Sequence, residues 1–461
     1  MRILSKRFYT LFFIGILAPI AENKEMNKQP VRPNVIVIVT DDQGYGDVGV
    51  FGGTDLKTPN IDKLFNSGVR FTNWYSNSPV CAPARASMMT GKYPEKAGVP
   101  DLLGIRKPGL HLKEKTIADA FKSLHYKTAL IGKWHLGGAL EYRPNKRGFD
   151  YFFGILEGCV DYFSHMYFLP RSNRPFHDLW RNEEPAWEDG KYLTHLISSE
   201  SKNFILENLD NPFYLNIAYN GPHYPLQVPR NYIDEFKGLT SERQAIAALI
   251  KAVDDGIGEI IALLDEHKML ENTIIFFQSD NGSSNEMRNF YYDHEKNIFN
   301  GGSAGGLKGN KGSLFEGGIK VPAAIYWEGH LPSGIINDQI GIGMDIFPTL
   351  LSMAGSDLKQ YENIDGKDLS QMIKNGDKSP HECLFWEYLN QKAVRKDGWK
   401  LIVNGKLDFE RPAQDSLILI NLNDDPGESN NLSDSEPLKL QELKSELNNW
   451  DKITSNPYDN D

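Results

Sequence analysis

The chain has 461 residues, of which 40% are hydrophobic and 24% charged. This composition is typical of a globular protein with a sizeable core, and it excludes collagen-like, coiled-coil and intrinsically disordered chains. The 50 Lys and Arg residues are outnumbered by 61 Asp and Glu residues, which gives a formal net charge of -11. We therefore expect no nucleic-acid partner, and an anionic substrate would need a locally cationic site.

The first 21 residues have the layout of a secretory signal peptide. Arg2, Lys6 and Arg7 precede an apolar run over residues 8–21, and a polar stretch follows at 22–29. That order of charged, apolar and polar segments is typical of exported proteins. The run is short for a membrane span, and no other stretch has the roughly 20 apolar residues that such a span requires. We expect a periplasmic or secreted protein with no membrane span; a buried N-terminal helix is the alternative.

Four short apolar runs, each followed by polar residues, predict the strands of a parallel sheet. Helical segments such as 116–124 and 243–266 separate them along the chain. Unbroken β-rich runs are typical of buried strands in a doubly wound α/β fold, and ligands bind such sheets outside the carboxyl ends of the strands. We therefore expect the polar residues after these runs to form one active site. The runs are residues 34–40, 128–132, 213–219 and 273–279.

The sequence pattern changes after about residue 345. A helix over 345–354 is expected to close the large domain, and a charged amphipathic helix is expected over 435–450. Between them lie three short strand-like pieces, at residues 384–388, 400–403 and 417–421. This pattern predicts a C-terminal α+β subdomain with a short antiparallel sheet and one helix. The predicted parts are a signal peptide (1–21), a catalytic domain (22–375) and this subdomain (376–461).

The three cysteines, Cys81, Cys159 and Cys383, cannot all pair within the chain, so at least one thiol needs another explanation. Cys159 and Cys383 are either a disulfide or two buried small side chains, and the sequence does not decide between these. Cys81 lies at the predicted start of a short helix that ends at Gly91. Helix N-terminal amides, together with Arg85 one turn further along the same face, would form an anion pocket around Cys81.

The segment Cys81-Ala82-Pro83-Ala84-Arg85, followed by Ser87 and Thr90-Gly91, resembles the signature of the type I, formylglycine-dependent sulfatases. Further blocks resemble those of the same family and occur in the same order. They are 41–47 (DDQGYGD), 132–137 (GKWHLG), 279–282 (SDNG) and Lys311-Gly312 before 316–318 (EGG). The resemblance covers roughly residues 33–431. It implies an alkaline-phosphatase-like fold with a doubly wound, mostly parallel sheet flanked by helices.

Three other segments resemble most closely the N-acetylgalactosamine-4-sulfatase-like branch of that family. They are 148–150 (GFD), 161–165 (DYFSH) and 225–229 (PLQVP). The branch includes bacterial enzymes that act on algal and animal sulfated polysaccharides. The resemblance therefore implies a sulfated carbohydrate substrate without naming the sugar or the sulfate position. Loops at 142–182 and 285–300 are expected to set specificity, because binding residues favour loops on a rigid scaffold.

The resemblance also implies a modified nucleophile at position 81. In this family a maturase oxidises the motif cysteine to Cα-formylglycine (3-oxoalanine), and the hydrated aldehyde attacks sulfur. The second hydroxyl of the diol then expels the sulfate, whereas a plain Ser or Cys would stay trapped as its sulfate ester. A modified Cys81 would account for the leftover thiol.

Asp41, Asp42, Asp280 and Asn281 correspond to the metal ligands of the family, together with residue 81 as formylglycine. An all-oxygen set with three carboxylates suits Ca²⁺, which we expect, or Mg²⁺ as the second choice, rather than zinc. A cation would also compensate Asp41 and Asp42, which otherwise place two buried like charges side by side.

The remaining positions that match the family are Arg85, Lys133, His135, His223 and Lys311. Arg85 would orient the diol, and the two lysines would bind sulfate oxygens and oppose the charge of the transition state. His223 with Lys311 would protonate the leaving alcohol, and His135 would act as the base for the second proton of the diol. Many members carry arginine where Lys308 stands, so Lys308 competes with Lys311 for one place; the spacing to residues 316–318 favours Lys311.

These patterns together predict an exported sulfatase that hydrolyses sulfate esters of carbohydrates. One alternative is a formylglycine-dependent phosphonate or phosphodiester hydrolase of the same superfamily, although those enzymes use additional Asp and His ligands. The other alternative is a glycan-binding protein that keeps Cys81 unconverted. The predicted catalytic residues argue against the latter.

Overall fold

The computed structural model describes residues 32–167, 175–285, 301–361, 363–409, 411–454 and 457–458. The predicted signal peptide at 1–21 lies outside the described residues, as do parts of both loops expected to set specificity, 168–174 and 286–300. Within these described ranges, no helix is long and apolar enough to cross a membrane.

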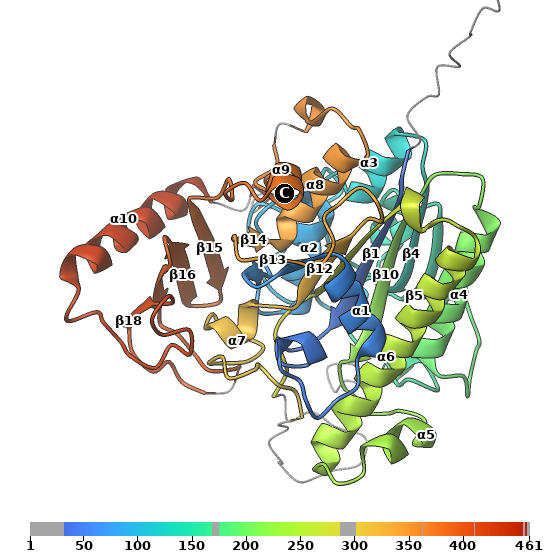
Figure 1. Cartoon of the computed structure of the whole chain (residues 1–461), viewed down its shortest axis with the longest axis horizontal. Helices are drawn as coiled ribbons and strands as arrows, with labels where there is room; N and C mark the ends of the chain where they lie inside the picture. The colour runs from blue at the N-terminus through green and yellow to red at the C-terminus, as the bar shows by residue number, and fades with distance from the viewer. Residues whose placement is uncertain are drawn as a thin grey trace, which may run out of the picture. The chain divides into compact units, whose positions relative to one another are not determined.

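A ten-stranded mixed sheet carries the four predicted strands at its centre (Figure 1). Five neighbouring strands run parallel, in the order β11 (Thr273–Ser279), β1 (Asn34–Asp41), β10 (Phe213–Pro222), β4 (Lys127–Lys133) and β5 (Tyr151–Ile155). The shorter strands at the edges are β12 (Ala323–Tyr326), β2 (Val69–Phe71), β13 (Ile335–Asn337), β8 (Trp180–Arg181) and β9 (Glu184–Pro185). The sheet confirms the predicted doubly wound, mostly parallel fold class.

Hydrophobic cores cover both faces of this sheet. Ile36 and Ile38 of β1 pack into the core beneath α1 (Pro59–Ser67), α4 (Leu193–Glu207) and α6 (Ser241–Glu266). Val35, Val37 and Val39 point to the opposite core. That core is formed by α2 (Cys81–Thr90), α3 (Ile117–Ser123), α8 (Ile346–Met353) and α9 (Ser370–Asn375). Burial on both faces explains why the sequence of β1 is continuously apolar rather than alternating.

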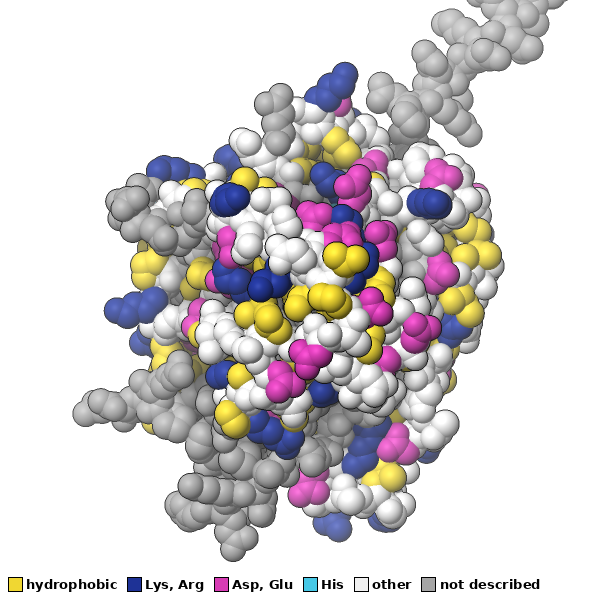
Figure 2. All heavy atoms as spheres, turned by 90° about the vertical axis from the view of Figure 1, so that its left-hand side faces the viewer, with side chains coloured by type: hydrophobic (Ala, Val, Ile, Leu, Met, Phe, Trp, Pro, Cys, Tyr) yellow, Lys and Arg dark blue, Asp and Glu magenta, His cyan; other side chains and the backbone are white. Residues whose placement is uncertain are grey.

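A smaller antiparallel sheet follows, with strands β15 (Cys383–Tyr388), β16 (Gln391–Lys396), β17 (Trp399–Val403) and β18 (Leu417–Asn421). The helix α10 (Pro437–Ile453) packs Leu443, Leu447 and Trp450 into the core of this sheet. Lys, Arg, Asp and Glu side chains are interspersed on the face that α10 and this sheet present (Figure 2). The antiparallel sheet and its helix were predicted, but β16 was missed because its sequence, QKAVRK, is mostly polar. The boundary at residue 375 stays a prediction, since residues Arg32–Asp461 form one compact unit.

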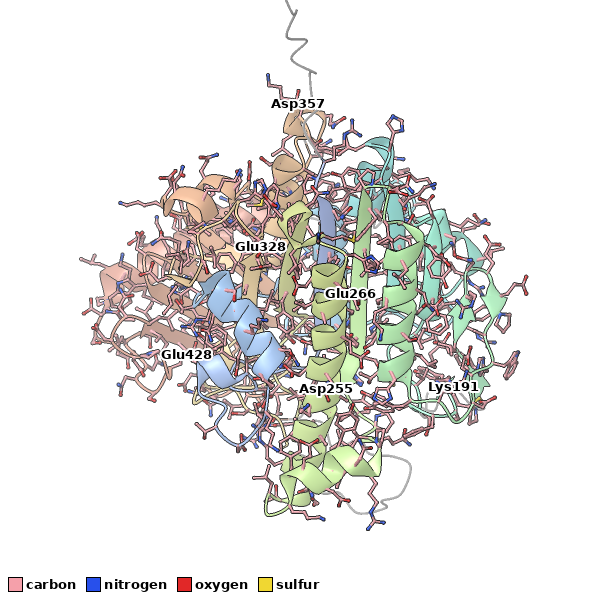
Figure 3. All side chains as sticks on the ribbon, turned by 45° about the vertical axis from the view of Figure 1, so that its right-hand side comes forward. Lys191, Asp255, Glu266, Glu328, Asp357 and Glu428 are labelled. Carbon is pink, nitrogen blue, oxygen red and sulfur yellow. The ribbon has the colours of Figure 1, made fainter. Side chains whose placement is uncertain are left out.

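A buried ion-pair network joins the small sheet to the large one. Lys400 of β17 is fully buried, and its Nζ donates to Glu316 Oε1 at 2.8 Å and to Glu428 Oε1 at 3.0 Å. Glu316 begins the short helix α7 (Glu316–Ile319) and accepts a hydrogen bond from the Tyr75 hydroxyl. Burial raises the pKa of Glu428 to about 7. Figure 3 labels Glu428 at this junction. One buried ammonium therefore compensates two buried carboxyl groups.

Replacement of Lys400 by methionine is expected to lower the free energy of unfolding by about 3–5 kcal/mol, because it removes the one ammonium group that hydrogen-bonds to both buried carboxyl groups. The loss should be larger at pH 8 than at pH 5.5. A carboxyl group whose pKa is raised in the folded state binds its proton more tightly there, so acid favours the folded state. Thermal unfolding of wild type and Lys400→Met at both pH values measures this.

Lys396→Met on the neighbouring strand is the matched control. Lys396 pairs with Glu442 and Glu446 at the surface, and such exposed pairs contribute about 1 kcal/mol or less. Equal destabilisation by the two substitutions would contradict the role assigned to Lys400.

Candidate active site

Cys81 is the first residue of α2, as the sequence predicted, and its side chain is buried. The helix ends at Gly91, whose φ of 69° lies in the left-handed region that glycine adopts without strain. Burial raises the pKa of the Cys81 thiol to about 11, although the charges of Lys133 and Lys311 lower it. An unmodified thiol here is therefore protonated at neutral pH and a poor nucleophile. Cys159 and Cys383 form no disulfide bond with each other, so the pairing considered for them is absent.

Three carboxylates meet at the carboxyl ends of two adjacent strands. Asp41 ends β1, Asp42 follows it, and Asp280 follows β11, the parallel neighbour of β1. Each of the three offers an oxygen within 4.8 Å of the others, and all three side chains are buried. The backbone amide of Asp42 donates to Asp280 Oδ1 at 3.2 Å, which locks the two strand ends together. The predicted convergence of polar strand ends is thus observed for these acids.

Each of the three carboxylates pairs with a different buried cation. Lys133 Nζ donates to Asp41 Oδ2 at 2.6 Å, and Lys311 Nζ donates to Asp42 Oδ2 at 3.0 Å. These two lysines were assigned from the sequence to sulfate oxygens, and in this structure both bind carboxylates. Lys311 is also the lysine that reaches this site. Lys308 instead donates to the backbone carbonyl of Glu428 and lies over the ring of Phe315.

Arg85 makes the third pairing through its planar guanidinium group. Its Nε and Nη2 atoms both donate to Asp280 Oδ2, at 3.0 and 2.7 Å, and its Nη1 donates to the backbone carbonyl of Lys133 at 3.0 Å. The carboxyl end of β4 is thereby tied to that of β11. Burial would lower the pKa of Arg85, but Asp280 and Asp41 outweigh it and raise the pKa. The guanidinium is therefore a fixed positive charge beside residue 81.

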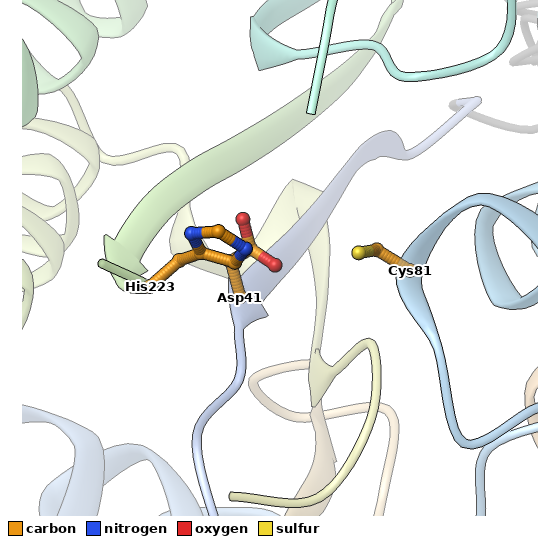
Figure 4. Close-up of side chains that lie close together, drawn as sticks. All are labelled: Asp41, Cys81 and His223. Atoms are coloured by element: carbon orange, nitrogen blue, oxygen red, sulfur yellow. The ribbon is translucent and has the colours of Figure 1, made fainter. Parts of the chain in front are cut away.

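Two histidines complete the group. His223 follows β10, and its Nε2 lies 3.7 Å from Asp42 Oδ2. Asp41, Cys81 and His223 offer ligand atoms within 4.8 Å of one another. Figure 4 shows these three side chains, which come from three different segments of the chain. His135 follows β4 and is buried, and its Nδ1 has no hydrogen-bond partner among the described residues. Burial, and next the charges of neighbouring lysines, hold the pKa of both histidines well below the usual range.

The contacts of His223 settle its tautomer when it is neutral. Its Nδ1 lies 2.7 Å from the backbone carbonyl of Tyr224, and a carbonyl oxygen can only accept. Nδ1 therefore carries the hydrogen, and the Nε2 lone pair points toward Asp42 and the site. In this form His223 accepts a proton and cannot donate one through Nε2. The sequence assigned protonation of the leaving alcohol to His223 together with Lys311, and in this tautomer Lys311 would have to supply the proton.

The oxygen donors at the strand ends fit a hard divalent cation. Asp41 Oδ1 and Asn281 Oδ1 are buried and accept no hydrogen bond within the described ranges. Burial, and next the negative charge of Asp41, raise the pKa of Asp280. The second cause is electrostatic repulsion between the two carboxylates. Ca²⁺ and Mg²⁺ bind carboxylate and amide oxygens, whereas zinc prefers nitrogen and sulfur. The donor set thus suits the calcium predicted from the sequence.

Sequence reasoning missed several residues that hold this site in place. The Tyr162 hydroxyl lies 2.8 Å from the backbone carbonyl of His223, and Ser76 Oγ donates to the backbone carbonyl of Asp280 at 2.5 Å. A Cβ at Gly158 would lie 2.8 Å from the His135 ring, so only glycine leaves room for that imidazole. Tyr162 lies in the DYFSH segment noted for its family likeness. A single Ser, Tyr or Gly in a loop carries no pattern that would identify these contacts from sequence.

The sheet gathers acidic strand ends and buried cations at one edge, which forms a site for a cation and an anionic ligand. Residues 33–356 match the Sulfatase family model, and residues 309–453 match the model described as "N-sulphoglucosamine sulphohydrolase, C-terminal". The chain belongs to the sulfatase family and is a sulfuric ester hydrolase.

Individual relatives agree with this family. The N-acetylgalactosamine-6-sulfatase of Sus scrofa is 31% identical over 75% of this chain and 67% of its own length. The steryl-sulfatase of Homo sapiens is 32% identical over 79% of this chain and 74% of its own. The solved structure of Ps i-CgsB in complex with k-i-k-neocarrahexaose superposes with a TM-score of 0.82 at 30% identity, covering 92% of this chain and 94% of that one. The predicted family and its alkaline-phosphatase-like fold are confirmed.

Calcium is expected to raise the unfolding temperature of the wild-type protein, because a ligand bound only by the folded state stabilises it by about 2.7 kcal/mol at a hundred times its dissociation constant. The Asp280→Asn variant should lose this shift, since it removes a carboxylate that the ion needs. Thermal unfolding with and without Ca²⁺, after dialysis against chelator, measures the effect.

Asp254→Asn is the matched control. Asp254 is also fully buried, but its carboxylate accepts hydrogen bonds from the backbone amides of Asn60 and Ile61 at the start of α1. This variant should unfold at a lower temperature and still respond to Ca²⁺. A full calcium shift in Asp280→Asn would rule out the predicted ligand set.

Proposed function

We propose that this protein hydrolyses sulfate esters of sulfated carbohydrates, with residue 81 as formylglycine at the reacting centre. The observation that carries the proposal is the position of Cys81, at the N-terminus of a buried helix and within 4.8 Å of ligand atoms of Asp41 and His223. Three buried cations, Arg85, Lys133 and Lys311, stand around this group. An oxidised residue 81 would replace a protonated thiol, which is inert here, with a reactive carbonyl.

Two of the three relatives named above support a carbohydrate substrate, and the third is a steryl-sulfatase. One is an N-acetylgalactosamine sulfatase, and the solved structure of Ps i-CgsB holds a neocarrahexaose. The DYFSH and PLQVP segments of this chain resemble the N-acetylgalactosamine-4-sulfatase-like branch, whose substrates are also sulfated carbohydrates. Sulfate on a sugar is a compact anion, and in a chain with a net charge of -11 it needs local positive charge. A divalent cation bound beside Arg85, Lys133 and Lys311 would supply that charge.

We further propose that Asp41, Asp42, Asp280 and Asn281 hold Ca²⁺ together with the formylglycine at position 81. The bound ion would supply positive charge that polarises the sulfate ester and lowers the pKa of the aldehyde hydrate. The hydrate itself would supply one hydroxyl for attack on sulfur and a second one for release of sulfate.

The residues of the chain itself would position the groups and move the protons. Arg85, fixed by Asp280 and by the carbonyl of Lys133, would orient residue 81. Lys133 and Lys311 would oppose charge that develops on the sulfate oxygens, since preorganised cations in a dry site stabilise a transition state strongly.

Protons would move on either side of the reacting sulfur. Lys311 and His223 both lie against Asp42, so they would serve the leaving alcohol together. Lys311 would deliver the proton, because the low pKa keeps His223 neutral at neutral pH. His135, also neutral and with an unpaired Nδ1, would accept the proton of the second hydroxyl.

Export and maturation complete the proposal. The signal-like residues 1–21 would direct the chain to the periplasm or the medium, and a formylglycine-generating maturase would oxidise Cys81 during biosynthesis. Because Cys81 is buried in the folded protein, we propose that this oxidation precedes folding.

Substitution of Cys81 by alanine is expected to abolish sulfate release while preserving the fold, because alanine cannot form the hydrate. Cys81→Ser should also be inactive unless the host has a maturase that oxidises serine. Ion chromatography of released sulfate and the circular dichroism spectrum give the two readouts. Cys383→Ala, a change at a free cysteine of the small sheet, is the control and should keep full activity. Substantial turnover by Cys81→Ala would refute the proposed nucleophile.

A substrate panel separates the proposed function from its alternatives. It contains sulfated galactan oligosaccharides, oligosaccharides with sulfated N-acetylgalactosamine, and a phosphonate monoester. We expect sulfate release from at least one sugar and little cleavage of the phosphonate. Faster cleavage of the phosphonate would favour a phosphorus hydrolase. Sugar binding without turnover, by protein from its native host in which mass spectrometry shows Cys81 to be unconverted, would favour the glycan-binding alternative.

A further inference from the structure

A second group of possible metal ligands lies outside the active site. His165 ends the DYFSH turn just before β6 (Met166–Tyr167), and His177 is the last residue of β7 (Phe176–His177). Asp189 lies in the turn between β9 and α4. These three residues, which we name the His-His-Asp cluster, offer ligand atoms within 4.8 Å of one another. No residue of this cluster was assigned a role in the active site.

The two imidazoles of the His-His-Asp cluster have buried nitrogens without partners. His165 is fully buried, and its Nε2 lies 3.1 Å from the backbone carbonyl of Lys191. Because the carbonyl can only accept, Nε2 carries the hydrogen and Nδ1 holds a lone pair. Neither His165 Nδ1 nor His177 Nε2 has a hydrogen-bond partner in the part of the chain that the structure describes. Two neighbouring buried nitrogens without hydrogen-bond partners lower the stability of the folded state, and a bound ion would give both of them a partner.

We infer that the His-His-Asp cluster binds a divalent transition-metal ion of the zinc type. Two imidazoles and one carboxylate are donors that Zn²⁺ prefers, with a fourth position left for water. Ligand atoms at about 2.0–2.2 Å from a shared ion lie roughly 3–4 Å apart, so small side-chain shifts complete the site. The carbonyl of Lys191 orients His165 as the outer partner of a metal-bound histidine commonly does.

The surroundings of the His-His-Asp cluster show what a bound ion stabilises. The carboxylate of Asp161 accepts the backbone amides of Phe163 and Ser164, which shapes the turn that presents His165. On the other side, the amide of Gly190 donates to the carbonyl of Phe163. Figure 3 locates the adjacent Lys191 on the loop that leads into α4. An ion would therefore fasten the turn at 161–165 to residues 189–191.

An ion at the His-His-Asp cluster would affect the active site through Tyr162. The hydroxyl of Tyr162, in the middle of the same turn, lies 2.8 Å from the backbone carbonyl of His223. The amide of Leu193 donates to the carbonyl of Tyr162 at 2.9 Å, so the segment after Asp189 also braces that tyrosine. The ion at the His-His-Asp cluster would thus support the segment behind His223, and it is separate from the all-oxygen site at the strand ends.

Zinc titration of the full chain in saturating Ca²⁺ tests the inference. By isothermal titration calorimetry, wild type should bind one more equivalent of Zn²⁺ than His177→Ala or Asp189→Asn. Zinc should also raise the unfolding temperature of wild type by several degrees and leave that of the two variants unchanged. Asp189 is exposed, so its replacement by asparagine does not disturb the core, and this variant keeps the test valid if His177→Ala folds poorly.

His195→Gln is the matched control for these variants. His195 lies on α4, and its Nε2 contacts the hydroxyl of Tyr232 rather than the His-His-Asp cluster. This variant should bind zinc as wild type does. Zinc that binds in the active site adds the same stoichiometry to wild type and to all three variants. The difference in stoichiometry between these proteins therefore reports on the His-His-Asp cluster alone. Equal zinc stoichiometry and equal thermal shifts in wild type, His177→Ala and Asp189→Asn would overturn the inference.

Discussion

The mutual repulsion of Asp41, Asp42 and Asp280 is the constraint on which the rest of the site depends. Adjacent parallel strands bring these carboxylates together in a buried place, where like charges are costly unless opposite charges or a cation accompany them. The chain answers with one buried cation for each carboxylate. Arg85 comes from α2, Lys133 from the end of β4 and Lys311 from the loop before α7. Segments far apart in sequence are thus held together by charge.

Further hydrogen bonds link the loop that carries Lys311 to α2 and to the small sheet. The amide of Lys311 donates to the carbonyl of Ser283, and the next amide donates to the carbonyl of Pro79, just before α2. A few residues further along, Glu316 enters the buried network around Lys400 in the small sheet. The C-terminal subdomain therefore supports the loop that carries Lys311. Strand β17, which contributes no proposed catalytic residue, is thereby joined to the loop that carries Lys311.

Much of the fold was predictable from the sequence because β1, β4, β10 and β11 are buried on both faces and read as unbroken apolar runs. Strand β16 was not predictable, because its pairing with two neighbours, and not its composition, makes it a strand. In the site, parallel pairing made the convergence of Asp41 and Asp280 predictable. The ion pair between Lys133 and Asp41 and the His-His-Asp cluster were not, since they depend on side-chain placement across irregular segments.

The most direct test of sulfate-ester hydrolysis at this site is the position of bond cleavage in water enriched in oxygen-18. Attack on sulfur by a hydrated residue 81 breaks the bond between sulfur and the ester oxygen. The released sulfate should therefore carry oxygen from the solvent, and the sugar hydroxyl should keep its original oxygen. Mass spectrometry of both products from a sulfated oligosaccharide that the enzyme turns over decides this. Label in the sugar hydroxyl, with none gained by sulfate, would show cleavage at carbon and contradict the proposed chemistry.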